Sequence, residues 1–193
     1  MIPAFLLIVA AVAYRIVTGL AITSGTTWLS NFAPMAAIAL CGAAYFPARY
    51  KFTVPLIALF ITDIVLNVHY GASMFHPLIV GRYLALIVIG LLGWGLAHRA
   101  SWKIMLPASL AGSVLFYGIT NVFAWLSDPG YVKNFAGLVQ ALTVGLPQYS
   151  ATPSWMFFRN SVLSDLLFTG LFILCMHWGR SPVRASSALP RPI

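Results

Sequence analysis

Long apolar runs alternate with short polar segments along almost the whole chain. Six apolar segments follow from this pattern, at about 3–23, 32–46, 53–70, 77–97, 105–126 and 161–178. About 20 helical residues cross the hydrocarbon core of a bilayer, so the pattern predicts an all-α membrane protein with six transmembrane helices. Pro47 ends the short second segment and Pro55 opens the third, because a helix tolerates proline in its first turn.

The segments between and after the predicted helices complete a single domain. Residues 1–180 are expected to form this transmembrane domain, and the Ser-, Pro- and Arg-rich residues 181–193 a disordered cytoplasmic tail. A long external segment, 128–160, separates the last two predicted helices. Its apolar middle, 135–147, is too short to cross a bilayer, so we expect a helix that lies in the membrane interface or folds over the bundle mouth as a gate.

The composition excludes a soluble globular fold. Of the 193 residues, 61% are hydrophobic and 7% are charged, against about 45–50% and ~25% in a typical soluble domain. Cys41 and Cys175 lie in separate apolar runs, so neither a disulfide framework nor a thiolate metal site is expected. The net charge of +8 comes from basic residues scattered in ones and twos, and a nucleic-acid partner is therefore not expected.

The basic residues indicate how the predicted helices are oriented in the lipid bilayer. Alternating the connections across the membrane places seven of the eleven Lys and Arg residues on one side: Arg49, Lys51, Arg99, Lys103, Arg180, Arg184 and Arg191. Short loops rich in Lys and Arg stay in the cytoplasm. The sequence therefore predicts a multi-pass protein of the bacterial cytoplasmic (inner) membrane with both termini in the cytoplasm.

Four ionisable residues fall in the outer halves of the predicted helices: Arg15, Asp63, Arg82 and Asp165. Each would cost about 2.5–3.5 kcal/mol if it faced lipid at the bilayer centre. We therefore expect all four to face the bundle interior and to pair. Asp63 is expected to pair with Arg82, and Asp165 with Arg15 or Arg159.

Uncharged polar residues extend the same helix faces at helical spacing. On these faces lie Thr18, Asn67, Tyr70, Ser113, Tyr117, Asn121 and Ser161. The inner halves are largely apolar, and residues 85–97 hold no ionisable side chain. The pattern predicts a polar cavity that faces outward above an apolar floor, which is typical of a binding site and not of an open ion channel. The alternative interpretation is that the charged residues only hold the helices in register.

Other candidate chemistry is sparse. His69 and His76 flank an external loop, but two histidines without an acidic third ligand favour interfacial polar groups over a metal site. The chain has no glutamate and no Gly-rich phosphate loop, and the neighbours of Asp63 and Asp165 match no intramembrane protease motif. No catalytic residue is predicted, and an intramembrane enzyme ranks behind the other interpretations.

Several sequence segments resemble a family of small, uncharacterised bacterial membrane proteins. They are residues 31–40 (NFAPMAAIAL), 42–46 (GAAYF), 62–66 (TDIVL), 112–121 (GSVLFYGITN) and 137–140 (GLVQ), and the resemblance covers about residues 5–178. This family in turn resembles the six-helix substrate-binding (S) components of energy-coupling-factor transporters in size, helix number, polar outer half and external lid, a likeness by analogy of fold. Those components bind vitamins or metal ions in an outward-facing cavity.

The resemblance implies an integral membrane protein that binds and transports a small solute, such as a vitamin, a cofactor precursor or a metal-related solute. The expected substrate-binding residues are Arg15, Asp63, Asn67, Arg82, Tyr117, Asn121 and Asp165. A transmembrane coupling subunit would be the partner, although the Ala-x-x-x-Ala pattern of such components is not met around Ala10, Ala11 and Ala13. Similarity to stand-alone cobalamin-transporting relatives implies a cobalamin-like ligand, with His69 or His76 as the cobalt ligand.

The alternative function is that of a non-catalytic accessory subunit of a larger membrane complex. Small residues recur four apart at three pairs: Ala39 and Ala43, Ala108 and Gly112, and Ser109 and Ser113. Such faces allow close helix packing, either within the chain or against a neighbouring membrane protein.

Overall fold

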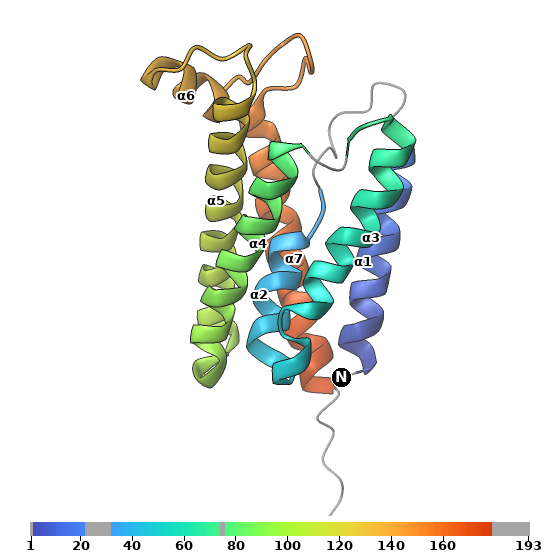
Figure 1. Ribbon diagram of the computed structural model, residues 1–193. Coiled ribbons are helices and arrows are strands. Elements are labelled where there is room, and N and C mark those ends of the chain that lie inside the picture. Colours follow the sequence, from blue (N-terminus) through green and yellow to red (C-terminus); the bar gives the residue numbers. More distant parts are fainter. Residues whose placement is uncertain (1, 22–31, 74–75, 179–193) are drawn as a thin grey trace, which may run out of the picture.

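Every regular element of the structure is helical. The computed structural model describes residues 2–21, 32–73 and 76–178, which form seven α-helices and two short 3-10 helices (Figure 1). In chain order they are α1 (Ile2–Ala21), α2 (Met35–Tyr45), η1 (Ala48–Tyr50), α3 (Thr53–Tyr70), α4 (Pro77–Leu96), η2 (Ala97–Arg99), α5 (Trp102–Ser127), α6 (Phe135–Leu142) and α7 (Ser154–Trp178). The predicted all-α fold class is confirmed, since these residues contain no strand.

Among the described residues, five helical segments are long and apolar enough to cross a membrane: α1, α3 with η1, α4 with η2, α5 and α7. The sixth predicted span, 32–46, contains only α2. Its 11 residues extend about 16 Å at ~1.5 Å per residue, which is about half of the ~30 Å hydrocarbon thickness of a bilayer. The bundle therefore combines five long helices with one half-length helix, and the six-span topology stays a prediction.

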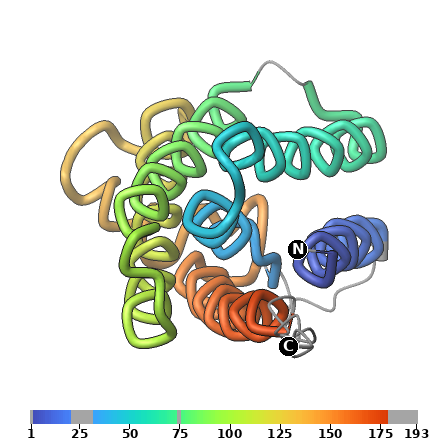
Figure 2. Tube along the Cα trace, turned by 90° about the horizontal axis from the view of Figure 1, so that it is seen from below, coloured from blue at the N-terminus to red at the C-terminus, as the bar shows by residue number. Residues whose placement is uncertain are grey.

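The half-length helix α2 lies at the centre of the bundle (Figure 2). Its residues 35–44 are all buried, and it contacts α3, α4, α5 and α7. An apolar surface on all sides is typical of a helix buried in a core. At the closest approach, a Cβ atom added to Gly93 of α4 would lie 2.2 Å from the Leu40 carbonyl oxygen of α2. Glycine is therefore required at position 93 for the two helices to pack at this distance.

Helices α1 and α3 form a pair at the side of the bundle. They lie next to each other in both views (Figures 1 and 2), and the Tyr70 hydroxyl of α3 donates a hydrogen bond to the Gly19 carbonyl of α1. Apolar residues join this pair to the other helices. This core includes Ile8, Leu40, Leu59, Ile89, Met105 and Phe172, each at most 3% exposed. It fills the half of the bundle that contains α2.

The segment between α5 and α7 folds against one end of these two helices. Its short helix α6 lies there (Figure 1), and Tyr131, Ala141 and Leu146 form a small second core. The Tyr117 hydroxyl of α5 donates a hydrogen bond of 2.6 Å to the Leu142 carbonyl, which ties α6 to α5. We refer to this end of the bundle as the α6 end. A short helix agrees with the sequence pattern, but the segment is shorter than predicted because α7 begins at residue 154.

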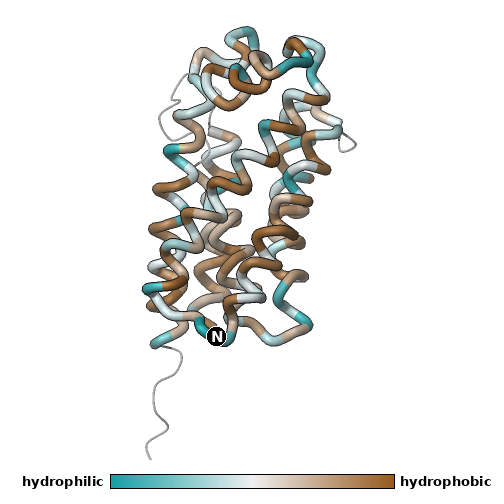
Figure 3. Tube along the Cα trace, turned by 90° about the vertical axis from the view of Figure 1, so that its left-hand side faces the viewer, coloured by the Kyte–Doolittle hydropathy of each residue, from teal (hydrophilic) through white to brown (hydrophobic). Residues whose placement is uncertain are grey.

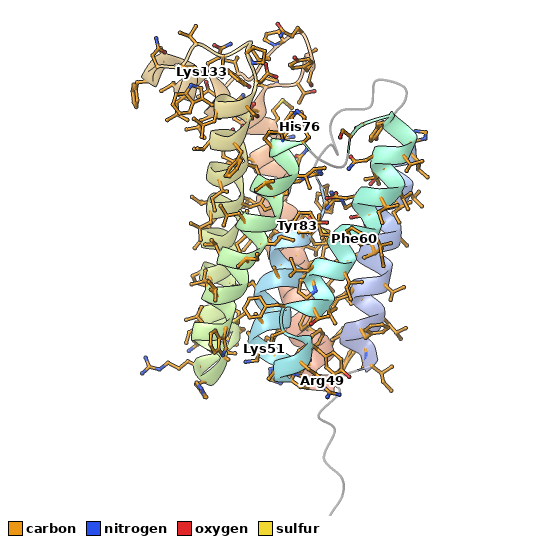
Figure 4. All side chains as sticks on the ribbon, viewed as in Figure 1. Arg49, Lys51, Phe60, His76, Tyr83 and Lys133 are labelled. Atoms are coloured by element: carbon orange, nitrogen blue, oxygen red, sulfur yellow. The ribbon has the colours of Figure 1, made fainter. Side chains whose placement is uncertain are left out.

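Charged residues mark the two ends of the bundle. Arg49 and Lys51 lie at one end, and Lys133 lies at the α6 end (Figure 4). The end with Arg49 also holds η2 and the described ends of α1 and α7 (Figure 1), as expected if both termini lie on the positively charged side. Hydrophobic positions dominate between the ends (Figure 3). The compartment on each side stays a prediction, and the predicted tail 181–193 falls outside the described residues.

Candidate functional site

A cavity of about 470 Å³ lies in the half of the bundle toward the α6 end. Helices α1, α3, α4, α5 and α7 and residues 32–36 form its wall. The polar lining residues are Arg15, Thr18, Tyr70, Arg82, Thr120, Ser161 and Asp165. The remaining lining residues are Gly19, Phe32, Ala33, Met35, Ala36, Leu66, Leu78 and Phe116. A volume of this size is within the range of small-molecule sites.

The cavity exists because α2 occupies only half of the bundle axis. Pro34 stands directly before the first helical residue, with φ −83° and ψ 43°. A proline disfavours the helical conformation in the residue before it. Residues 32–34 therefore continue toward the α6 end as non-helical chain (Figure 1), and space remains beyond the first turn of α2.

A charged cluster of Arg15, Asp63 and Arg82 joins three helices beside this space. Arg15 Nη2 donates a hydrogen bond of 3.2 Å to Asp63 Oδ1, and Arg82 Nη1 forms an ion pair with the same oxygen at 3.2 Å. The Asp63 side chain is 1% exposed, against 13% for Arg15 and 27% for Arg82. The predicted pairing of Asp63 with Arg82 is present, and Arg15 joins it. Two guanidinium groups thus share one carboxylate, and the cluster carries one excess positive charge.

Asp165 does not pair with Arg15 or Arg159, so this predicted pairing is wrong. Its Oδ1 accepts the backbone N–H of Ala37 at 2.9 Å, and its Oδ2 accepts the Ser113 hydroxyl at 2.8 Å. Ala37 lies in the first turn of α2, where N–H groups lack helical partners and the helix dipole favours a negative charge. The guanidinium of Arg159 instead donates to the neighbouring Asn160 side chain.

A short chain of hydroxyl groups lies below Asp165. The Thr169 hydroxyl, one turn further along α7, donates a hydrogen bond of 2.9 Å to the Ser109 hydroxyl of α5. Cys41 of α2 lies 4.0 Å from Thr169 Oγ1. Phe172 follows on α7 and belongs to the apolar core. Sequence analysis missed Thr169, although its spacing of four from Asp165 places both on one helix face.

The predicted site residues Tyr117 and Asn121 line a separate, smaller cavity of about 180 Å³. It adjoins the larger one, because Phe116, Thr120 and Ser161 line both. The Asn121 amide donates to the Tyr117 carbonyl of its own helix at 2.9 Å. Asn67, the remaining predicted site residue, is buried and lines neither cavity.

The sequence predicted that the segment 128–160 lies in the membrane interface or folds over the mouth as a gate. Of its residues, Ser154 and Phe157 line the smaller cavity, whereas residues 128–153 line neither cavity. The reason is their anchoring to α5. Besides the Tyr117 contact, the Trp125 indole N–H donates a hydrogen bond of 2.9 Å to the Val132 carbonyl. These contacts hold the start of the segment and α6 on α5, beside the cavity.

The two histidines at the α6 end do not meet a group of metal ligands. His76 Nδ1 accepts the Leu78 backbone N–H at 3.3 Å and so caps α4. His69 is exposed, and its ring contacts the Tyr70 ring. In the part of the chain that the structure describes, no cluster of three or more His, Cys, Asp or Glu side chains could hold a metal ion. A cobalamin-like ligand stays a prediction.

Comparison with known proteins places the chain by sequence. None of the curated proteins and none of the solved structures matches it significantly. The similarity to energy-coupling-factor S components therefore stays a prediction. A family model matches residues 1–186, in agreement with the sequence segments that resemble an uncharacterised family, and the chain belongs to the Family of unknown function (DUF6580).

Proposed function

We propose that this protein binds a small polar or zwitterionic solute in the 470 Å³ cavity and transports it across a cytoplasmic membrane, in the manner of an energy-coupling-factor S component. The observation that carries the proposal is the position of Arg15, Arg82 and Asp165. All three line one cavity of ligand size within a bundle whose core is largely apolar. Ionisable residues in transmembrane helices are costly, and they commonly mark substrate sites.

The floor of the cavity determines how transport could occur. Leu40, Ile89 and Phe172 are each at most 2% exposed and belong to the apolar core below the charged residues. A polar solute cannot pass this core without movement of the helices. The pair α1 and α3 is the candidate for that movement, because it lies at the side of the bundle and lines the cavity through Arg15, Thr18 and Tyr70.

The helix faces with small residues, which suggested an accessory subunit, pack against other helices of the same chain. Ala39 and Ala43 are buried on α2, and Ser109 and Ser113 are buried on α5, each at most 1% exposed. These faces therefore do not argue for a partner protein, and solute binding is the function that the geometry supports best.

Native mass spectrometry of the protein purified in mild detergent tests the proposal. We expect the wild type to retain a small molecule and Thr120→Phe to lose it, because Thr120 lines both cavities and a phenyl group would fill the space. Leu115→Phe is the matched control, since Leu115 lies on the same helix and is 37% exposed. Equal retention by both variants, or no retained solute in the wild type, would refute binding in this cavity.

A further inference from the structure

We infer that the solute is an organic monocarboxylate whose carboxylate is bound by Arg15 and Arg82 and whose apolar part lies against Phe32 and Phe116. This inference rests on the proposed function and specifies its substrate class. Four features of the cavity support it: the charge balance, the donors left on the guanidinium groups, the size of the excess charge and the apolar lining.

The charge balance favours an anion. Arg15 and Arg82 are opposed by Asp63 alone, through one oxygen. Asp165 forms no ion pair with either guanidinium group, and its two oxygens accept the Ala37 N–H and the Ser113 hydroxyl instead. The first turn of α2 provides a positive partial charge for Asp165. The excess positive charge therefore remains on the side of the cavity formed by α1 and α4.

The guanidinium groups have N–H donors that Asp63 does not use. Each guanidinium carries five N–H donors in a planar fork that matches the two oxygens of a carboxylate. Asp63 contacts only Nη2 of Arg15 and Nη1 of Arg82. Arg82 Nε is buried and has no hydrogen-bond partner in the structure. An unpaired buried donor is costly, and Asp63 Oδ2 is likewise buried without a partner, so the contacts within the cluster leave both groups incompletely satisfied.

A carboxylate matches the excess charge better than a phosphate does. The cluster of Arg15, Asp63 and Arg82 exceeds neutrality by one charge, whereas a phosphate monoester carries about −1.5 to −2 at neutral pH. The cavity walls then define the rest of the molecule. Phe32 and Phe116 offer aromatic surface, and the Thr18, Thr120 and Ser161 side chains supply a few polar contacts. This mixed lining is typical of sites for ligands with one charged group and an apolar body.

Asp63 acts in this site as a positioning residue. It is 1% exposed and does not line the cavity, yet it contacts both guanidinium groups. Its shared oxygen fixes the distance between Arg15 and Arg82. Because Asp63 fixes the positions of the two guanidinium groups before a ligand binds, it lowers the entropic cost of binding.

Three probes with the same body and different charges test the inference: 4-phenylbutyrate, 4-phenylbutanamide and 4-phenylbutylamine. Isothermal titration calorimetry of the purified full-length protein would measure their dissociation constants. We expect the carboxylate to bind at least about tenfold more tightly than the amide and the amine, as two charge-assisted hydrogen bonds allow. Arg82→Gln should reduce this preference to below about twofold. Arg82→Lys should keep part of it, because lysine retains the charge without the fork.

Arg159→Gln is the matched control, since Arg159 is exposed and lines neither cavity. It should keep the full preference for the carboxylate. Equal or tighter binding of the amine or the amide would overturn the carboxylate assignment, and so would the absence of binding by all three probes. The proposed function is judged separately, because Thr120→Phe should abolish retention of the native solute whatever the charge of that solute is.

Discussion

Neutralising Asp63 should destabilise the protein far more than removing the charge of Arg82. The carboxylate oxygen Oδ1 lies 3.2 Å from a nitrogen of Arg15 and 3.2 Å from a nitrogen of Arg82. The substitution Asp63→Asn removes the negative charge and leaves two guanidinium groups facing each other. At a separation of about 6 Å and an effective dielectric constant of ~20, two unit charges repel by ~3 kcal/mol. Breaking a buried ion pair by removing one partner costs about 3–5 kcal/mol.

The substitution Arg82→Gln should have a much smaller effect on stability. It leaves Arg15 and Asp63 as a one-to-one pair without excess charge. The Arg82 side chain is also 27% exposed, so its ion pair is partly screened and its loss is expected to change the free energy of unfolding by less than about 1 kcal/mol. The expected order of stability therefore places Arg82→Gln close to the wild type and Asp63→Asn ~3–5 kcal/mol below it.

Unfolding in mixed micelles, followed by tryptophan fluorescence against denaturant concentration, measures these free energies. Asp128→Asn is the matched control, because this substitution makes the same chemical change at a position outside the long helices. Its Oδ1 accepts the Gly130 N–H at 2.7 Å in an exposed turn. An equal loss in Asp63→Asn and Arg82→Gln would refute the excess positive charge. It would indicate instead a balanced network in which each member is needed, which is the interpretation that assigns these residues only to helix register.

Two further predictions concern the bundle itself. Gly93→Ala should destabilise the protein by about 1–3 kcal/mol, because the new Cβ would lie 2.2 Å from the Leu40 carbonyl oxygen, whereas Gly95→Ala on the same helix has no atom within 4 Å and should change thermal stability little. Reporter fusions after residues 101 and 130 should report opposite compartments, with 101 in the cytoplasm, because α5 separates them. The same compartment for both would contradict this topology.

The sequence allowed the long helices and the shared depth of the charged residues to be predicted. Hydropathy is read directly from the side chains along the sequence. A run of about 20 apolar residues leaves few alternatives to a membrane-spanning helix. The cost of burying charge made an Asp63–Arg82 pair predictable, whereas Arg15 was expected to pair with Asp165 and joins Asp63 instead. Both arguments use the hydropathy and the charge of a residue, which do not depend on its neighbours in space.

The partner of Asp165 could not be predicted from side chains. Its donors are a backbone N–H of Ala37 and a serine hydroxyl. Every residue except proline has a backbone N–H, so the sequence pattern does not mark which one is available. It becomes available because α2 begins at Met35 and leaves the N–H groups of its first turn without helical partners.

The positions of Tyr117 and Asn121 differ from prediction for a geometric reason. At 3.6 residues per turn, residues four apart on a helix are offset by about 40°, and residues eight apart by ~80°. Ser113 reaches Asp165 at the first turn of α2. By Asn121 the polar face has turned away from the bundle axis and toward α7, where Ser154 and Phe157 complete the smaller cavity.

The start of α2 at Pro34 connects the cavity to the charges around it. If this helix continued by two more turns toward the α6 end, its backbone would occupy the space that the cavity now fills. The first-turn N–H groups would then be bonded within the helix, and Asp165 would lose the Ala37 donor at 2.9 Å. The half-length of α2 thus accounts both for the volume of the cavity and for the backbone donor that holds Asp165, and the proposed anionic solute would bind in the space that this helix leaves.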